Sequence, residues 1–111
     1  MKELLTLKSR SEFLHVAKGK SVAAKGLVLQ AMKREEGNSP RLGFTVSRKI
    51  GSAVIRNRVK RRLKEVAKEV LGNLAENDYD YVLIGRKNAE KRPFEGLIKD
   101  LKYAFYQIHG K

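Results

Sequence analysis

Apolar residues recur along the chain with two different periods, and the longer period predicts helices. Ser9 followed three residues later by Glu12 is typical of a capping box, so a short helix is expected over residues 9–18. A long amphipathic helix is predicted over residues 52–71, with Gly72 as its C-cap. Its apolar positions, spaced by three or four, are Ile55, Val59, Leu63, Val66, Ala67 and Val70.

The other apolar segments are shorter and predict strands. Residues 22–34 and 41–49 are separated by the polar stretch 35–40, which predicts a β-hairpin, with or without a further short strand at its start. The apolar run 81–84, bounded by Gly85, predicts a buried strand.

A third helix is expected to begin at Pro93, because apolar residues at helical spacing follow it. They are Leu97, Ile98, Leu101, Ala104, Phe105 and Ile108. The predicted order is helix, two or three strands, helix, strand, helix. This order indicates a single α+β domain over residues 1–111, with helices packed on a mixed sheet.

The segment 41–49 has two unlike faces. Leu42, Phe44 and Val46 alternate with Gly43, Thr45 and Ser47, so one face is apolar and the other is small and polar. A strand face of small residues allows a ligand backbone to approach closely, which makes this face a candidate binding surface.

Composition adds a strong charge to this fold. The chain has 111 residues, with 25 Lys and Arg against 12 Asp and Glu, and a formal net charge of +13. Such an excess favours a polyanionic partner, with nucleic acid first and an anionic membrane surface second. The sequence contains no cysteine, which excludes thiol catalysis, disulfides and cysteine-based zinc sites and is compatible with a reducing cytosol. Its short apolar runs predict neither a secretory signal nor a membrane span.

Most of the excess charge lies in residues 48–64, which hold eight basic and no acidic side chains. Such a cluster at a helix start opposes the helix dipole and lacks the acids that stabilise a solvated face, so it indicates binding rather than folding. A solvated charged face is the alternative. Five of the eight are arginines, which pair bidentately with phosphate. The cluster is Arg48, Lys49, Arg56, Arg58, Lys60, Arg61, Arg62 and Lys64.

The same segment resembles a family signature. The run from Arg56 to Arg61 matches the pattern Arg-Asn-Arg-x-Lys-Arg of the bacterial ribonuclease P protein component, and the preceding residues 47–51 agree too. Further similarities are the helix segment 7–13, the strand segment 41–43 and the basic pair at 86–87, so the resemblance covers nearly the whole chain.

The resemblance implies an α-β-β-β-α-β-α fold on a four-stranded mixed sheet, like the second domain of ribosomal protein S5, with a left-handed crossover. It also implies the small subunit of a cytoplasmic ribonucleoprotein endonuclease that removes the 5′ leader from precursor tRNA. In this family the large RNA carries the catalysis and holds the required Mg²⁺. The protein is then expected to be a monomer without catalytic residues, tightly bound metal or membrane contact.

The resemblance further implies two RNA-binding surfaces. The helix contacting the catalytic RNA would present Arg56, Asn57, Arg58, Lys60, Arg61, Arg62 and Lys64. A cleft for the single-stranded leader would contain Phe13, Phe44, Val46, Ser47, Arg48, Lys49, Arg86 and Lys87. Ala17 and Gln30 stand where many members have aromatic residues, so fewer stacking partners are expected in this cleft.

Other functions have weaker support. A ribosomal protein is the main alternative, because the same charge and fold would serve ribosomal RNA. A protein enzyme would need an acid–base pair, a nucleophile or a metal cluster, and His15 and His109 lie far apart without such partners. A helix-turn-helix DNA-binding protein needs two short helices where strands are predicted. A membrane-surface helix needs exposed apolar residues that the sheet is expected to cover.

Overall fold

A mixed five-stranded sheet organises the computed structural model, which describes residues 4–35 and 39–110. The strand order is β1-β4-β5-β3-β2. The strands are β1 (Leu5–Thr6), β2 (Lys20–Ala23), β3 (Leu27–Lys33), β4 (Arg41–Thr45) and β5 (Tyr79–Gly85). The helices are α1 (Arg10–Ala17), α2 (Ala53–Leu74) and α3 (Phe94–His109), with short 3₁₀ helices η1 (Arg48–Ile50) and η2 (Lys87–Glu90). The predicted α+β class is confirmed, with five strands instead of four because Leu5–Thr6 adds a short strand parallel to β4.

The hairpin predicted from residues 22–34 and 41–49 is wrong. β3 and β4 do not pair, because β5 lies between them, antiparallel to β3 and parallel to β4. β5 is apolar on both faces from Tyr81 to Ile84 and therefore takes the central position, where both faces are covered. The hairpin that does form joins β2 to β3, with Ser21 opposite Gln30.

The helix starts are as predicted. In α1 the Glu12 amide donates to Ser9 Oγ at 3.3 Å, and the Ser9 amide donates to Glu12 Oε1 at 2.9 Å, which confirms the capping box. Ser52 caps α2 by accepting a hydrogen bond from the Ile55 amide at 3.3 Å. Pro93 is the N-cap of α3.

The end of α2 is later than predicted. The helix continues through Gly72 to Leu74, and Ala75 takes the C-cap position. Leu71, Gly72 and Ala75 are all buried, so packing against the core outweighs the low helix propensity of glycine.

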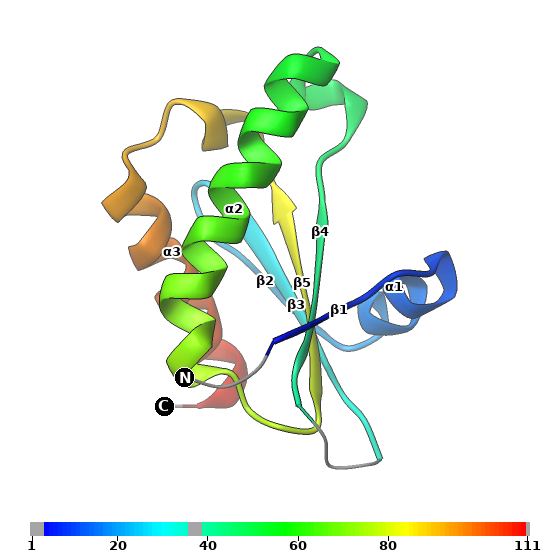
Figure 1. Ribbon diagram of the computed structural model, residues 1–111. Helices are drawn as coiled ribbons and strands as arrows, with labels where there is room; N and C mark the ends of the chain where they lie inside the picture. Colours follow the sequence, from blue (N-terminus) through cyan, green and yellow to red (C-terminus); the bar gives the residue numbers. More distant parts are fainter. Residues whose placement is uncertain (1–3, 36–38, 111) are drawn as a thin grey trace.

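The connection from β4 through α2 to β5 is left-handed, as the family resemblance implies. Figure 1 looks along the sheet from its β1 edge, with α2 and α3 on one face and α1 on the other. Seen from α2 with both parallel strands pointing up, β5 lies to the left of β4. Most such connections are right-handed, so this topology is distinctive.

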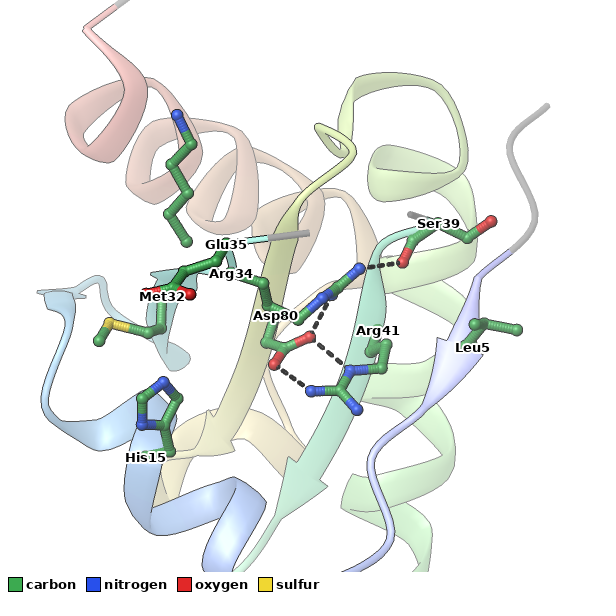
Figure 2. Close-up of a pocket in the computed structure, with 9 residues that line it drawn as sticks. Leu5, His15, Met32, Arg34, Glu35, Ser39, Arg41 and Asp80 are labelled. Carbon is green, nitrogen blue, oxygen red and sulfur yellow. Dashed lines mark hydrogen bonds and ion pairs between the residues drawn. The ribbon is translucent and has the colours of Figure 1, made fainter. Parts of the chain in front are cut away.

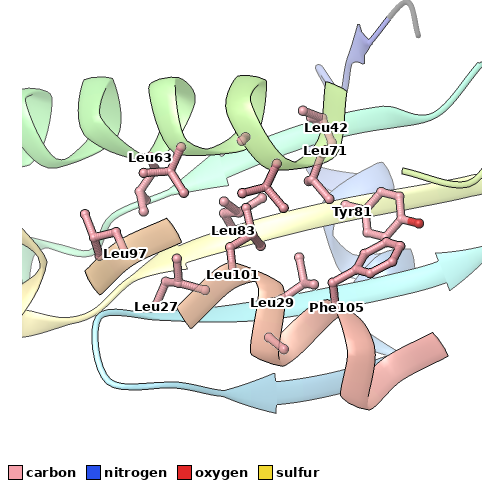
Figure 3. Packing of buried hydrophobic residues seen from close by; sticks show 14 of the residues in the cluster. Leu27, Leu29, Leu42, Leu63, Leu71, Tyr81, Leu83, Leu97, Leu101 and Phe105 are labelled. Atoms are coloured by element: carbon pink, nitrogen blue, oxygen red, sulfur yellow. The ribbon is translucent and has the colours of Figure 1, made fainter. Parts of the chain in front are cut away.

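The two faces of the sheet are covered unequally. Leucines of α2, α3, β3, β4 and β5 pack together with the rings of Tyr81 and Phe105 in the main core (Figure 3). On the other face, α1 buries only a small cluster of Leu7, Val16 and Val82. The second face therefore keeps much of its surface open to solvent.

Candidate nucleic-acid interface

A cleft of about 570 Å³ lies between the start of α1 and the edge of β4. We name it the Phe13 cleft. It is lined by Thr6, Leu7, Lys8, Arg10, Phe13, Gln30, Gly43, Phe44, Thr45, Lys60, Lys64 and Val82. The lining combines two phenylalanines with four basic side chains, and none of the four forms an ion pair within the described residues. An aromatic surface beside free cations is the chemistry that holds single-stranded nucleic acid.

Phe13 lies directly over Gly43. A Cβ atom at Gly43 would stand 2.5 Å from Phe13 Cε1, so this position has room only for glycine. The small face of β4 was expected to admit a ligand backbone, and at Gly43 it admits the Phe13 ring instead. Thr45, the next residue on that face, is exposed in the cleft.

The structure divides the residues predicted for the leader cleft. Phe13 and Phe44 line the Phe13 cleft. Phe44 and Val46 both pack against the main core on the α2 side of the sheet, and only Phe44 also reaches the cleft. The other predicted residues, Ser47, Arg48, Lys49, Arg86 and Lys87, are exposed but lie outside this cleft.

The basic side of α2 meets the cleft. Lys60 and Lys64, predicted only as contacts for the catalytic RNA, also line the Phe13 cleft. Asn57 and Arg61 are exposed on the same helix. The two predicted surfaces are therefore adjacent.

Three arginines of α2 already have partners in the protein. Arg56 Nη1 donates to the Gly51 carbonyl at 3.0 Å, and Arg58 Nη1 forms a 2.6 Å ion pair with Glu90. Arg62 is half-buried and donates to the carbonyls of Ala89, Glu90 (2.7 Å) and Arg92 (2.5 Å). Arg62 was expected to be free to contact RNA, but its guanidinium instead holds η2 against α2. Its position on the helix places it beside η2.

A buried carboxylate joins the strands at the opposite end of the sheet. Asp80 is 1% exposed and accepts from Arg41 Nε at 2.7 Å, from Arg41 Nη2 at 2.6 Å and from Arg34 Nη1 at 2.5 Å (Figure 2). Arg41 also pairs with Glu12 of α1 at 2.8 Å. This network ties α1 to β4, to β5 and to Arg34, the residue after β3, and so positions the helix that carries Phe13.

The network shifts two ionisation equilibria. Hydrogen bonds to Asp80, with the attraction of its charge, raise the pKa of Arg41. Amide donors from Ser9 and then Lys8, with the nearby Arg41 charge, lower the pKa of Glu12.

An open hollow of about 810 Å³ beside Asp80 is lined by His15, Arg34 and Arg41 among others. Its two arginines are neutralised by carboxylates, so we assign this region a structural role.

The histidines belong to different environments. His15 is exposed on α1, whereas the His109 side chain is buried beside Tyr79, Tyr81 and Phe105 and its Nε2 lies 2.9 Å from Tyr81 Oη.

Within residues 4–35 and 39–110 no three His, Asp or Glu side chains converge as metal ligands would. Over the same part of the chain, every helix is too short or too polar to span a membrane.

Sequence reasoning missed several residues of the Phe13 cleft, notably Lys8 and Arg10. Both flank Ser9, whose capping role was evident, and a helix start beside a strand of small residues was the available signal. Lys25 was also missed, and it lies beside Arg86 in a separate hollow.

The fold and its charged cleft define a class of small, basic α+β proteins with a surface for polyanions. The family model described as Ribonuclease P matches residues 1–109. The chain is 45% identical to the Ribonuclease P protein component of Ruegeria pomeroyi over 94% of this chain and 86% of that protein. It is 47% identical to the Ribonuclease P protein component of Gluconacetobacter diazotrophicus over 86% of this chain and 84% of that protein.

Solved structures agree with the sequence comparison. The RNase P protein of Thermotoga maritima superposes with a TM-score of 0.77 at 30% identity, covering 93% of this chain and 96% of that one. The RNase P protein of Staphylococcus aureus gives a TM-score of 0.76 at 28% identity, covering 92% and 93%. This chain therefore belongs to the ribonuclease P protein component family, whose members are subunits of the ribonucleoprotein endoribonuclease RNase P.

Proposed function

We propose that this chain is the non-catalytic protein subunit of RNase P, and that it binds the catalytic RNA and the 5′ leader of precursor tRNA on two adjacent surfaces. The observation that carries the proposal is the Phe13 cleft, where two phenylalanines stand beside Lys60 and Lys64 of the basic helix. The leader occupies this cleft in the proposal, and structured RNA contacts the outer side of α2.

The outer side of α2 suits a phosphate backbone. Lys60, Arg61 and Lys64 are exposed, and within the described residues they form no ion pair. Arg48 and Lys49 of η1 extend the same charge beyond the N-terminus of α2. Neutralising phosphates at these positions releases counterions and makes binding depend steeply on salt.

The leader cleft suits an unpaired strand. The Phe13 ring is held against Gly43 and remains partly exposed, so an unpaired base can stack on it. Lys8 and Arg10 at the start of α1 are positioned to hold the strand's phosphates. Base-specific contacts are few in such an arrangement, which suits a leader of variable sequence.

The chemistry of cleavage is assigned to the RNA partner. Mg²⁺ in the holoenzyme is proposed to be held mainly by RNA, and the described side chains supply no cluster of metal ligands. The protein's cations would neutralise phosphates that otherwise need divalent ions, which lowers the Mg²⁺ requirement of the holoenzyme. The proposal includes a cytoplasmic location and a monomeric free protein, whose net charge of +13 makes copies repel one another.

Replacing Phe13 with Val tests the leader cleft. Loss of base stacking is expected to weaken binding of precursor tRNA to the holoenzyme by about 1–3 kcal/mol while leaving binding of mature tRNA unchanged. Equilibrium binding of both tRNAs to the reconstituted holoenzyme measures this difference. The matched control is Leu14→Val, because Leu14 is the next residue of α1 and is 52% exposed outside the cleft.

Two results would contradict the proposal. One is an equal loss of affinity for precursor and mature tRNA in the Phe13→Val holoenzyme. The other is a lower melting temperature with unchanged tRNA preference, which would make Phe13 a core residue only.

A further inference from the structure

A second hollow opens where the β2–β3 turn, the end of β5 and α3 meet. It consists of two pockets of about 400 and 360 Å³ that share Lys25 and Arg86. We name it the Tyr103 hollow. Its lining is Ala23, Ala24, Lys25, Arg86, Lys87, Asn88, Arg92, Asp100 and Tyr103.

The turn that carries Lys25 is fixed from two sides. The Gly26 amide donates to Asp100 Oδ2 at 2.9 Å, and a Cβ at Gly26 would stand 2.5 Å from Leu97 Cδ2. On the other side, Arg86 Nη1 donates to the Ala24 carbonyl at 2.7 Å. These bonds fix the backbone on either side of Lys25 and the guanidinium of Arg86 before any ligand arrives, which reduces the entropy lost on binding.

The hollow has unbalanced positive charge. Lys25, Arg86 and Lys87 are exposed, and no carboxylate within the described residues forms an ion pair with them. The one acid in the lining, Asp100, is buried and pairs with Arg92 at 2.6 Å while accepting from the Gly26 amide. The surface presented to a ligand is therefore cationic.

Tyr103 adds an exposed aromatic surface to this charge. Its side chain is 53% exposed, although a tyrosine on a helix beside a sheet could have been buried. An aromatic ring beside two cations matches the arrangement in the Phe13 cleft and the requirements of an unpaired nucleotide. An acidic peptide would satisfy the cations but would leave the ring without a stacking partner.

The open face of the sheet leads from the Phe13 cleft to the end of β5, beside which the Tyr103 hollow lies. Val82 lines the Phe13 cleft, Ile84 follows it on the same side of β5, and Arg86 comes directly after the end of that strand. Val82 lies three residues before the end of β5 at Gly85, a distance of about 10 Å along the strand. Figure 1 shows α1 over only part of this face, and α3 on the other face. An RNA strand that leaves the cleft along β5 would therefore pass the β2–β3 turn to reach Tyr103.

We infer that the Tyr103 hollow is a further binding site for single-stranded RNA, occupied by the part of the leader that lies upstream of the nucleotides in the Phe13 cleft. Tyr103 stacks on an unpaired base, and Lys25 and Arg86 hold the phosphates beside it. This inference rests on the proposed function, since it requires a leader in the Phe13 cleft.

The test measures binding of precursor tRNAs whose leaders increase stepwise in length, using the reconstituted holoenzyme with wild-type protein or Tyr103→Ala. With long leaders, Tyr103→Ala is expected to lower affinity about five- to a hundredfold, as loss of one stacked base predicts. With the shortest leaders it is expected to match wild type. Tyr103→Phe keeps the ring and should restore the wild-type series.

The control is Tyr106→Ala, because Tyr106 is 36% exposed on the same helix but does not line the hollow. Lys25→Ala is a second test variant in an exposed turn, and it should reduce the salt dependence of long-leader binding only. Thermal melting of each free protein separates binding effects from unfolding.

The results distinguish this inference from the proposed function. If Tyr103→Ala and Lys25→Ala match wild type at every leader length, the hollow does not bind the leader and the inference is wrong. Equal weakening at all lengths, mature tRNA included, would assign the hollow to the catalytic RNA or to another partner and would also overturn it. Failure of the Phe13→Val test would instead contradict the leader cleft itself.

Discussion

The two faces of the sheet use alternate residues of the same strands for different purposes. On β5, Tyr81 and Leu83 point into the core beneath α2 and α3, whereas Val82 and Ile84 point toward α1. The first face is sealed by two helices. The second is covered only by the two-turn helix α1, which leaves the Phe13 cleft beside it.

This difference separates stability from binding. Burial of apolar area on the α2 side supplies most of the hydrophobic stabilisation, since the larger cluster lies there. The α1 side can then keep polar and cationic residues exposed without loss of the fold. Substitutions on the two faces should consequently change different measurements.

The largest expected effect is on the sealed face. Phe105→Ala is expected to lower the free energy of unfolding by about 3–5 kcal/mol, because it leaves a cavity in the main core. Val82→Ala on the other face is expected to cost about 1–2 kcal/mol, since less apolar surface is removed. Urea unfolding measures both values.

Binding of precursor tRNA should change more with Val82→Ala than with Phe105→Ala, which is the opposite of their effects on stability. Among folded molecules, Val82→Ala should weaken precursor tRNA binding because Val82 supports the Phe13 side chain at the base of the cleft, and Phe105→Ala should not. If Phe105→Ala changed the preference for precursor over mature tRNA, the assignment of stability to one face and binding to the other would be wrong.

A smaller effect is expected from two neighbouring arginines of α2. Arg62→Lys keeps the charge but loses the fork that binds the carbonyls of η2, so the free energy of unfolding should fall by about 1.5–3 kcal/mol. Arg61→Ala should leave the melting temperature unchanged and reduce the slope of log K against log salt by about 0.7–0.9 for binding to the catalytic RNA.

Melting curves and salt titrations of both variants provide the measurement. A reduced salt slope for Arg62→Lys with an unchanged melting temperature would show that Arg62 contacts RNA directly, contrary to its place in the structure.

The smallest effect concerns pH and Glu12. The folded-state pKa of Glu12 lies below the ordinary value of 4.5, so its carboxylate stabilises the fold above that value and loses this effect as pH falls through the lowered pKa. Glu12→Gln should therefore melt below wild type at neutral pH, and the difference should shrink on acidification. Melting temperatures of both proteins from pH 7 to pH 3 test this prediction. A difference that stays constant over this range would show that the negative charge of Glu12 does not cause it.

The sequence predicted local features better than the pairing of distant segments. The capping box at Ser9, the N-cap at Ser52 and the helix start at Pro93 depend on neighbouring residues, and the structure confirms all three. The hairpin prediction failed because β5, which begins 34 residues after the end of β4, lies between the two strands. The pattern of residues within β3 and β4 does not indicate that a later strand lies between them.

The binding surfaces were predicted only in part, again because local sequence does not indicate contacts between distant segments. Helical spacing correctly indicated that Lys60, Arg61 and Lys64 are exposed. It could not indicate that η2 packs beside Arg62, or that Lys25 comes close to Arg86 across the sheet. Both depend on contacts between residues distant in sequence.

The central place of β5 has a consequence for the order of folding. β3 and β4 both precede β5 in the sequence, yet each depends on it for its main strand pairing. During synthesis, the β2–β3 hairpin can form early, but the sheet cannot close until residues 79–85 have left the ribosome. We expect the emerging chain to expose two unpaired strand edges throughout the synthesis of α2. In that interval the positive charge of residues 48–64 discourages association between nascent chains, so the residues assigned to RNA binding also protect the protein before it is folded.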